Sequence, residues 1–286
     1  MWLHDPITHN FFRYTENSST PTTRIPVPET TRAVETWCLG QDPGGALLAC
    51  FEGHGLWRYS GKWEQVKAPG LLIESPVSLV KGAGHVWLGY PHNQIALDDA
   101  SGFRIYGAAD GLDINSVLTF YESDGLVLAG GSDGLAYFDG AKFHSLHLRT
   151  SGLMRGVSGI VKDQFGDLWL NAGAGVIRLP ANEWDAAMQD ARYAMDFQFL
   201  NQQDGLFGSP AQSKPAPTAV ADSDGKLWFA TSGHIVSIDP ATVRKEQPPP
   251  NVLLQAVRVN GSALQYDKDI RVDSRRFKNL ESITSV

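Results

Sequence analysis

The chain has 286 residues, of which 42% are hydrophobic and 10% are aromatic, and its formal net charge is −7. Lys and Arg are scattered along the sequence, which argues against nucleic acid as a partner because a phosphate backbone needs a clustered basic surface. The first residues lack the basic start and apolar run of a signal peptide, and no stretch approaches the roughly 18 apolar residues of a membrane span. We therefore expect no export or anchoring signal within this sequence.

In chain order, the first predicted elements are two short strands over residues 2–6 and 10–14. A hairpin pattern then recurs five times, each copy reading Gly-x-apolar-apolar-x-small, a short loop and a second apolar run. The copies cover residues 45–59, 84–97, 124–138, 166–179 and 225–238. If Leu47, Val86, Leu126, Leu168 and Leu227 are equivalent, the copies are spaced by 39, 40, 42 and 59 residues. A period of about 40 residues with several strands per unit predicts a β-propeller.

Each unit divides into four strands, named a to d from the propeller axis outwards. In the third unit we expect strands a to d over residues 116–121, 126–129, 135–139 and 142–146. The two N-terminal strands match strands c and d of a blade that lacks its strands a and b. The predicted fold is thus all-β, with five anchored repeats and a half blade.

The two cysteines, Cys38 and Cys50, flank the turn at residues 42–45 almost symmetrically. A hairpin would place them opposite each other, and a disulfide would then form in an oxidising compartment. Two free cysteines in the core are the simpler interpretation, and we adopt it as the expectation.

Acidic residues recur just before the glycine turn of the repeat, at Asp42, Asp163 and Asp222. Their fixed place in the turn predicts hydrogen bonds from the carboxylate to the backbone and not catalysis. No Ser-His-Asp order, phosphate-binding glycine loop or carboxylate pair stands out. We therefore expect no catalytic residues and no cofactor.

The interval of 59 residues reflects an insertion in the fourth unit. Residues 180–190 are predicted to form a short helix with Trp184, Ala187 and Met188 on one side. Strand d then resumes over residues 197–200. We expect the insertion to cover an outer edge and protect strand d from pairing with other chains.

The last predicted segments suggest a change of domain. The propeller is assigned to residues 1–246 and a proline linker to residues 247–250. The sequence alternates like a strand over residues 252–259 and turns at Asn260-Gly261. A second, β-type domain is expected over residues 251–286.

These repeats resemble the two-component regulator propeller repeat, with the pattern D-x-x-G-x-L-W-hydrophobic-G/A-T. The matching residues are Asp222, Gly225, Leu227, Trp228, Ala230 and Thr231 in one unit, and Asp163, Gly166, Leu168, Trp169 and Gly175 in another. Residues 110–117 and 203–206 look like the D-G-L-x-x-N-x-V segment between blades of the family. Leu48 and Val127 replace the tryptophan in two units, and Gln94 replaces the glycine in a third. Residues 248–264 are similar to the start of the family's Y_Y_Y domain, an immunoglobulin-like β-sandwich.

The resemblance implies a seven-bladed ring in the extracytoplasmic sensor region of a histidine kinase or hybrid two-component system. It would bind an extracellular small molecule or glycan at the periplasmic face of the inner membrane. The sandwich would relay the signal to transmembrane and kinase segments outside this chain, in a parent that is a homodimer. The chain would then be a fragment and not itself an enzyme.

The loops between strands b and c are the predicted ligand-binding face, because they emerge near the central channel. Their candidate residues are Glu52, His54, His92, Asn93, Asp133, Asn171 and His234. The three histidines recur with the repeat and not as a compact ligand motif, so no metal site is expected. Trp87, Trp169 and Trp228 are expected to pack between blades. Two alternatives remain open: a propeller lyase of the streptogramin or polysaccharide type, and a scaffold that binds proteins.

Overall fold

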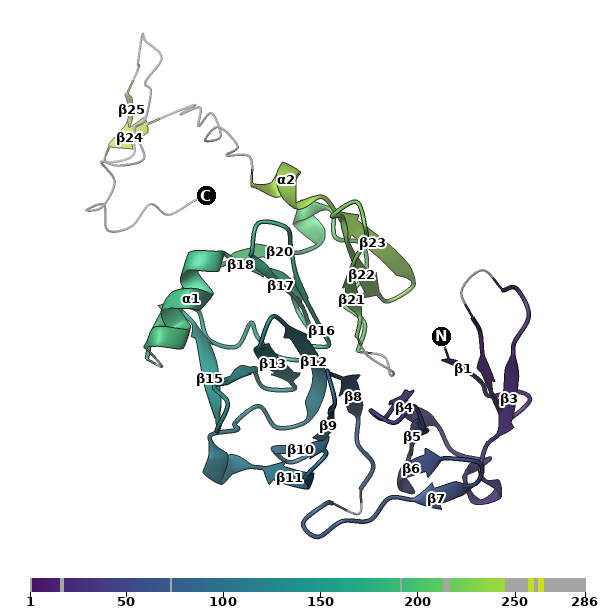
Figure 1. The fold of residues 1–286 in the computed structure, drawn as a ribbon. Coiled ribbons are helices and arrows are strands. Elements are labelled where there is room, and N and C mark those ends of the chain that lie inside the picture. Colours follow the sequence, from purple (N-terminus) through teal and green to yellow (C-terminus); the bar gives the residue numbers. More distant parts are fainter. Residues whose placement is uncertain are drawn as a thin grey trace. The chain divides into compact units, whose positions relative to one another are not determined.

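Sheets of three to five strands, antiparallel except for one parallel pair, follow one another along the chain and make up the first of two compact units, Met1–Pro240 (Figure 1). The second unit is Ala241–Val286. The structure is a computed structural model that describes residues 2–15, 18–72, 74–190, 192–212 and 217–244, and the backbone of residues 257–259 and 262–264.

The sheets follow the order of the repeats. The N-terminal sheet consists of β1 (Trp2–Asp5), β2 (Asn10–Arg13) and β3 (Thr23–Pro26). The first blade contains β4 (Thr36–Gln41), β5 (Leu47–Phe51), β6 (Gly55–Tyr59) and β7 (Trp63–Gln65). The second contains β8 (Ser78–Lys81), β9 (Val86–Tyr90), β10 (Gln94–Asp99) and β11 (Gly102–Tyr106).

The remaining blades continue this order. The third contains β12 (Val117–Ser123), β13 (Leu126–Gly131), β14 (Leu135–Phe138) and β15 (Phe143–Leu148). The fourth contains β16 (Gly159–Lys162), β17 (Leu168–Ala172), β18 (Gly175–Leu179) and β20 (Gln198–Leu200). The fifth has three described strands, β21 (Ala219–Ala221), β22 (Leu227–Thr231) and β23 (His234–Ile238).

The first strands of successive blades, β4, β8, β12, β16 and β21, contact one another from sheet to sheet (Figure 1). Later strands of each blade lie progressively outwards in the order a, b, c, d. Radially repeated four-stranded sheets with strand a innermost define a β-propeller. The predicted fold class is confirmed.

The core lies between the sheets, because strand b alternates its side chains between two neighbours. Leu47 and Ala49 of β5 belong to the cluster that contains Phe11 of the N-terminal sheet. Leu48 of the same strand packs with Leu88 of the second blade. Each blade is therefore apolar on both faces and depends on its neighbours for burial.

The third blade corrects the predicted alignment by one residue. Leu128 pairs with Tyr137 of strand c, just as Trp169 pairs with Arg178 in the fourth blade. Leu128, not Val127, therefore occupies the tryptophan position, and Val127 packs with Trp87 on the opposite face. The register shifts at a bulge between Val117 and Thr119. A shift of one residue moves a side chain to the other face of a sheet.

The N-terminal sheet corrects a second prediction. Trp2 lies opposite Arg13, which is the relation of Trp169 to Arg178, so β1 and β2 are strands b and c and not c and d. The outer strand is β3, which the sequence analysis did not predict. Pro26 lacks an N–H and lies on an edge strand, where proline is tolerated, so this segment has the composition of a loop.

The predicted insertion is helical, and its helix is α1 (Ala181–Gln189). Trp184 and Ala187 are buried, and Met188 packs against the same cluster, as the periodicity predicted. A short strand, β19 (Ala194–Met195), follows the helix and pairs in parallel with β15 of the third blade. The insertion thus covers an outer edge, but that of the preceding blade.

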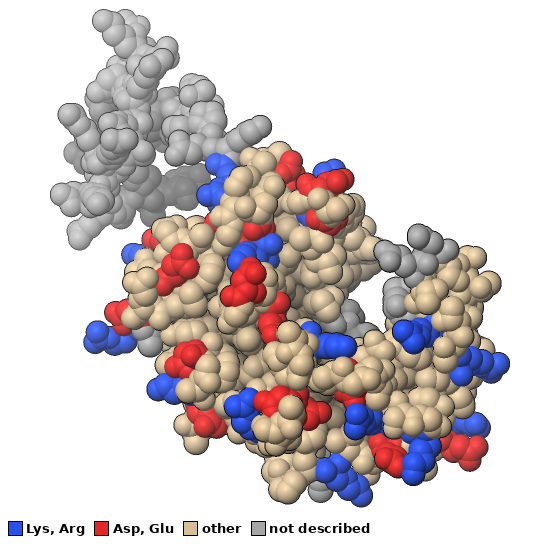
Figure 2. Space-filling view, viewed as in Figure 1, with Lys and Arg blue, Asp and Glu red and all other residues tan. Residues whose placement is uncertain are grey.

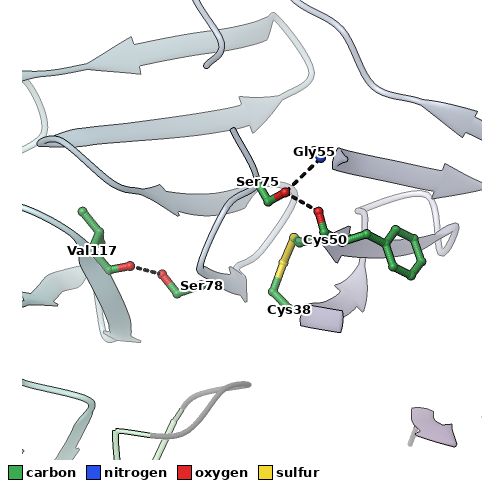
Figure 3. The surroundings of a disulfide bond; sticks show 7 residues. Cys38, Cys50, Gly55, Ser75, Ser78 and Val117 are labelled. Atoms are coloured by element: carbon green, nitrogen blue, oxygen red, sulfur yellow. Dashed lines mark hydrogen bonds between the residues drawn. A yellow bond between two sulfur atoms is a disulfide. The ribbon is translucent and has the colours of Figure 1, made fainter. Parts of the chain in front are cut away.

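Cys38 and Cys50 form a disulfide, which corrects the expectation of free thiols. They lie directly opposite each other in β4 and β5, with their Cα atoms 4.9 Å apart. Figure 3 shows this bond beside Ser75, which links the first blade to the segment leading to the second. The near symmetry about the turn was sufficient to bring the sulfur atoms together.

In the second unit, β24 (Val257–Val259) and β25 (Ser262–Leu264) form an antiparallel hairpin. The turn predicted at Asn260-Gly261 itself lies outside the described residues. The predicted proline linker at 247–250 and the rest of the sandwich at 251–286 lie outside the described residues, so these domain boundaries stay predictions. Within the described residues, no helix is sufficiently long and apolar to cross a membrane.

Candidate ligand-binding site

In the first blade, the candidate residues of the loop between strands b and c mainly stabilise the loop itself. The backbone N–H of Glu52 donates to Glu35 O at 2.9 Å. The Nδ1 atom of His54 lies 2.8 Å from Glu52 O. The carbonyl of His54 accepts hydrogen bonds from Trp57 Nε1 and Gln65 Nε2, both at 2.9 Å. These contacts fix the conformation of the loop.

A buried serine holds the same loop from the other side. Ser75 Oγ accepts a hydrogen bond of 2.9 Å from the N–H of Gly55 and donates to the carbonyl of Phe51 (Figure 3). Ser78, three residues later, donates through its Oγ to Val117 O at 2.7 Å. Ser75 therefore ties the segment before the second blade to the first blade, and Ser78 ties the second blade to the third.

In the second blade, the two candidates have different environments. His92 is exposed, and its Nε2 lies 3.7 Å from Glu74 Oε2. Asn93 turns inwards, and its Oδ1 accepts hydrogen bonds from the N–H groups of Ile114 at 2.7 Å and Asn115 at 2.5 Å. Both residues have positive φ, 59° and 54°. Asparagine is among the few residues other than glycine that adopt this left-handed conformation.

Asn115 connects two of the predicted site residues. Its Nδ2 donates to Asp133 Oδ2 at 3.1 Å, while its backbone N–H donates to Asn93. The backbone N–H of Asp133 donates to Ile114 O at 3.1 Å. Asn115 was noted in the D-G-L-x-x-N segment but not proposed for the site. The motif itself was the signal that could have placed it there.

Asn171 is not a loop residue, which corrects its predicted place. It lies within β17 and is 0% exposed. Its Nδ2 donates to Thr218 Oγ1 at 2.8 Å and to Ala230 O at 3.0 Å, whereas its Oδ1 has no partner among the described residues. Ser158 Oγ lies 2.8 Å from the same Thr218 Oγ1. The turn after β17 has only two residues before β18, so Asn171 remains in the strand and joins the fourth and fifth blades.

His234 is the first residue of β23, and it is exposed. Its ring centroid lies 6.3 Å from that of Phe207, whose side chain is 68% exposed. Phe207 belongs to the segment between the fourth and fifth blades and was not predicted as a site residue. The two rings form an exposed aromatic pair on this face.

A cavity of about 320 Å³ opens in the same segment. Most of its polar side chains are amides and hydroxyls, and the lining residues are Ala174, Asn201, Gln202, Gln203, Leu206, Gly208, Ser209 and Pro210. Ala174 comes from the loop between strands b and c of the fourth blade. None of these residues was predicted as a site residue, although Gln203 and Leu206 belong to the segment 203–206 that resembles the family's sequence between blades.

The three histidines do not converge. Within the described part of the chain, no three His, Cys, Asp or Glu side chains are grouped closely enough to hold a metal ion. On the face drawn in Figure 2, acidic and basic side chains of the described residues are interspersed.

The repeated tryptophans serve packing in two of the three cases. Trp87 is 2% exposed and Trp169 is 0% exposed, as expected for residues between blades. Trp228 is 37% exposed, which corrects the prediction for the fifth blade. Trp228 lies on the face of the fifth blade that, in the earlier blades, packs against the next blade. Val220 and Ile235 are exposed on the same face.

No family model and no curated protein matches the chain. Its fold is similar to the extracellular domain of BT3049 from B. thetaiotaomicron, a protein assigned as a hybrid two-component system. The TM-score is 0.64 at 14% identity, and the match covers 93% of this chain and 36% of that one. This chain thus spans about a third of that extracellular domain.

Two lyases have a similar fold. Virginiamycin B lyase from Staphylococcus aureus matches with a TM-score of 0.53 at 15% identity, over 83% of this chain and 79% of the lyase. A streptogramin B lyase matches with a TM-score of 0.50 at 14% identity, over 71% of this chain and 68% of that chain. At these identities the comparisons show the fold alone.

Proposed function

We propose that this chain is a ligand-sensing propeller module of an extracytoplasmic two-component receptor, and that it binds a small molecule or carbohydrate. The observation that carries the proposal is the similarity to the BT3049 extracellular domain, which extends over 93% of the chain. Nearly every element of this chain has a counterpart in a receptor domain of that kind.

The disulfide supports the same placement. Disulfides such as Cys38–Cys50 persist in oxidising compartments and are rare in the cytosol. Both cysteines are buried, so the bond acts within the core of the first blade. An extracytoplasmic location explains why a blade would carry such a bond.

The motif resemblance supports the finer assignment to the two-component regulator propeller repeat. In the fourth blade, Asp163 and Trp169 both match the repeat pattern, and a hydrogen bond of 2.9 Å joins them. In the fifth blade, Asp222 and Trp228 are joined at 2.7 Å. A Y_Y_Y sandwich beyond residue 250, a homodimeric parent at the inner membrane and an attached kinase are further parts of this proposal.

The ligand-binding face is proposed to be the one that carries the loops between strands b and c. Among the candidates, Glu52, His92 and His234 are exposed and available to a ligand, together with the aromatic ring of Phe207. Asn93, Asp133 and Asn171 hold neighbouring segments together, and we assign them supporting roles.

Binding without turnover is the property that tests the proposal. The 286-residue chain would be screened by thermal shift against extracellular monosaccharides, oligosaccharides and small metabolites, and hits would be measured by calorimetry. Mass spectrometry of each incubated mixture would report any chemical change. We expect at least one ligand that raises the melting temperature and is recovered unaltered. Recovery of a cleaved product would instead support the lyase alternative and overturn the sensor proposal.

A further inference from the structure

The segment between the fourth and fifth blades repeats the conformation of the segment between the second and third. Each contains a one-turn 3-10 helix, Ala108–Asp110 in one and Gln202–Asp204 in the other. In each, the last helical residue accepts a hydrogen bond from the N-cap N–H, at 2.9 Å for Asp110 and 3.0 Å for Asp204.

Both helices end in the same way. The glycines that follow them, Gly111 and Gly205, have φ of 82° and 89°, which is a left-handed conformation that favours glycine. A buried leucine comes next in both segments. After these leucines the later segment is one residue shorter. Gly208, with φ of 78°, lies in the place of Asn115, with φ of 60°, and Phe207 lies in the place of Ile114. The hydrogen bonds to the next blade have the same offset, because Ser232 N–H donates to Ser209 O as Ser132 N–H donates to Ser116 O.

The earlier segment is closed by a side chain from its own blade. Asn93, directly before strand β10, places its carboxamide oxygen 2.7 Å from the N–H of Ile114 and 2.5 Å from that of Asn115. This oxygen satisfies two consecutive backbone donors, one of them on the fully buried Ile114. The carboxamide of Asn93 thus acts as an internal ligand of the segment.

The later segment has no such side chain. The residue directly before strand β18 is Ala174, whose methyl group accepts no hydrogen bond, and its loop is one residue shorter than the loop with Asn93. Ser209 N–H is satisfied by Ser232 Oγ at 3.1 Å. The N–H of Gly208 has no acceptor in the described part of the chain. The cavity of about 320 Å³ is lined by Ala174, Gly208 and Ser209.

We propose that this cavity binds a small neutral molecule through a carboxamide or N-acyl group, whose carbonyl oxygen accepts a hydrogen bond from Gly208 N–H. The ligand would supply the group that Asn93 supplies in the earlier segment. Carboxamide and hydroxyl side chains of Gln202, Gln203 and Ser209 surround the cavity, and they offer both donors and acceptors to such a group. The lining has no charged residue that would favour a carboxylate.

The neighbouring aromatic pair suits the apolar part of the same ligand. Phe207 lies between lining residues Leu206 and Gly208 in the sequence, and its ring is 68% exposed. An exposed aromatic ring beside polar donors is typical of small-molecule sites that combine stacking with hydrogen bonds. This inference names a site for the sensing function proposed above, and it rests on that proposal for its biological role alone.

The test is a titration of the ¹⁵N-labelled 286-residue chain with acetamide, the smallest probe that carries the group, followed by amide NMR spectra. We expect saturable shifts of the Gly208 backbone signal and of the Gln202 and Gln203 side-chain signals. Acetate, which has the same shape and a negative charge, is the matched probe and should bind more weakly. Absence of saturable shifts over residues 201–209 would overturn the proposal.

Two variants locate the binding. Ala174→Asn supplies an internal carboxamide and should weaken acetamide binding by about tenfold or more; unchanged affinity in a folded Ala174→Asn variant contradicts the proposal. Asn93→Ala opens the equivalent position in the earlier segment, and acetamide should then shift the signals of Ile114 and Asn115. This second variant decides the question if Ala174→Asn fails to fold, because an absence of shifts there shows that the segment does not recognise carboxamides.

The outcomes also separate this inference from the proposed function. If acetamide binds at Gly208 but the chain converts screened compounds to products, the proposed carboxamide site is supported and the proposed sensing function is contradicted. If a ligand from the screen binds unaltered but leaves the Gly208 signal unchanged, the proposed sensing function is supported and the proposed carboxamide site is contradicted.

Discussion

The carboxylate of Asp163 accepts a hydrogen bond of 2.9 Å from the indole Nε1 of Trp169, six residues later. The same carboxylate accepts the backbone N–H groups of Phe165 and Asp167, at 2.8 and 3.0 Å. One side chain thus closes the turn and satisfies the buried indole of the next strand. In the second blade the residue six positions before Trp87 is Lys81, and Trp87 Nε1 has no partner among the described residues.

Replacement of Asp163 by Ala should lower the free energy of unfolding by about 2 kcal/mol, because it removes the carboxylate that accepts a buried indole N–H and two turn amides. Urea denaturation monitored by tryptophan fluorescence measures this change. Asp222→Ala is the matched control, since Asp222 makes the same contacts at an exposed position. Equal losses of unfolding free energy in the two variants would show that the cost does not depend on burial of the Asp–Trp pair.

The tryptophans of the fourth and fifth blades should differ in their contributions to stability. Trp169→Ala removes a fully buried ring and should cost about 3 to 5 kcal/mol. Trp228→Ala removes a ring that is 37% exposed, and its cost should be clearly smaller. Thermal unfolding of both variants is the measurement. A larger loss for Trp228→Ala would mean that its face is covered in solution.

The disulfide should be detectable as protection of both thiols. In denaturant without reductant, chain secreted into an oxidising compartment should resist alkylation at Cys38 and Cys50, whereas prior reduction should expose both. The bond joins residues separated by 12 positions, and its loss should cost about 3 kcal/mol. Full alkylation before reduction would show that the pair is not bonded and would remove one support for an extracytoplasmic location.

The pair of His144 and Asp139 should contribute a pH dependence. His144 Nε2 lies 2.6 Å from Asp139 Oδ2, and this hydrogen bond, together with those from the N–H groups of Lys142 and Ala141, holds the pKa of Asp139 well below its usual 3.8. The folded-state pKa is depressed, so the stabilisation is complete above the unfolded value of 3.8 and declines as the pH falls below it.

His144→Ala should therefore reduce the loss of unfolding free energy as the pH falls from about 5 towards the depressed folded-state pKa of Asp139, because the carboxyl group of the unfolded chain is protonated first. Urea denaturation at a series of pH values measures it. His147→Ala provides the control, because His147 is an exposed residue of the same strand. If the unfolding free energies of the two variants have the same dependence on pH, the hydrogen bond from His144 does not lower the pKa of Asp139.

The periodic features of this fold were predictable because each one depends on local sequence. The hairpins, the turn carboxylates of Asp42, Asp163 and Asp222 and the helix of the insertion all form from residues close together in the chain. The register of the third blade was missed although its signal is also local, because Leu128 follows Gly125 by three positions, as Trp169 follows Gly166. The outer strand β3 escaped prediction because proline and threonine gave it the composition of a loop.

The candidate site was predictable to a smaller extent. The sequence indicated the right group of loops, but it could not show that Asn93 and Asn171 turn inwards towards neighbouring segments. The cavity depends on Ala174, a residue that is informative only when compared with Asn93 in an equivalent position. That equivalence requires two loops of different length to be aligned in space.

The strand β19 belongs to the fourth repeat in sequence but completes the sheet of the third. The two repeats therefore cannot separate unless that parallel pair breaks, and Met195, which is fully buried, must leave the core at the same time. We expect the amides of the third and fourth blades to exchange with solvent as one cooperative unit, more slowly than those of a blade that contacts its neighbours only through side chains. An insertion that looks like surface decoration would then act as a clasp that sets the kinetic stability of the middle of the propeller.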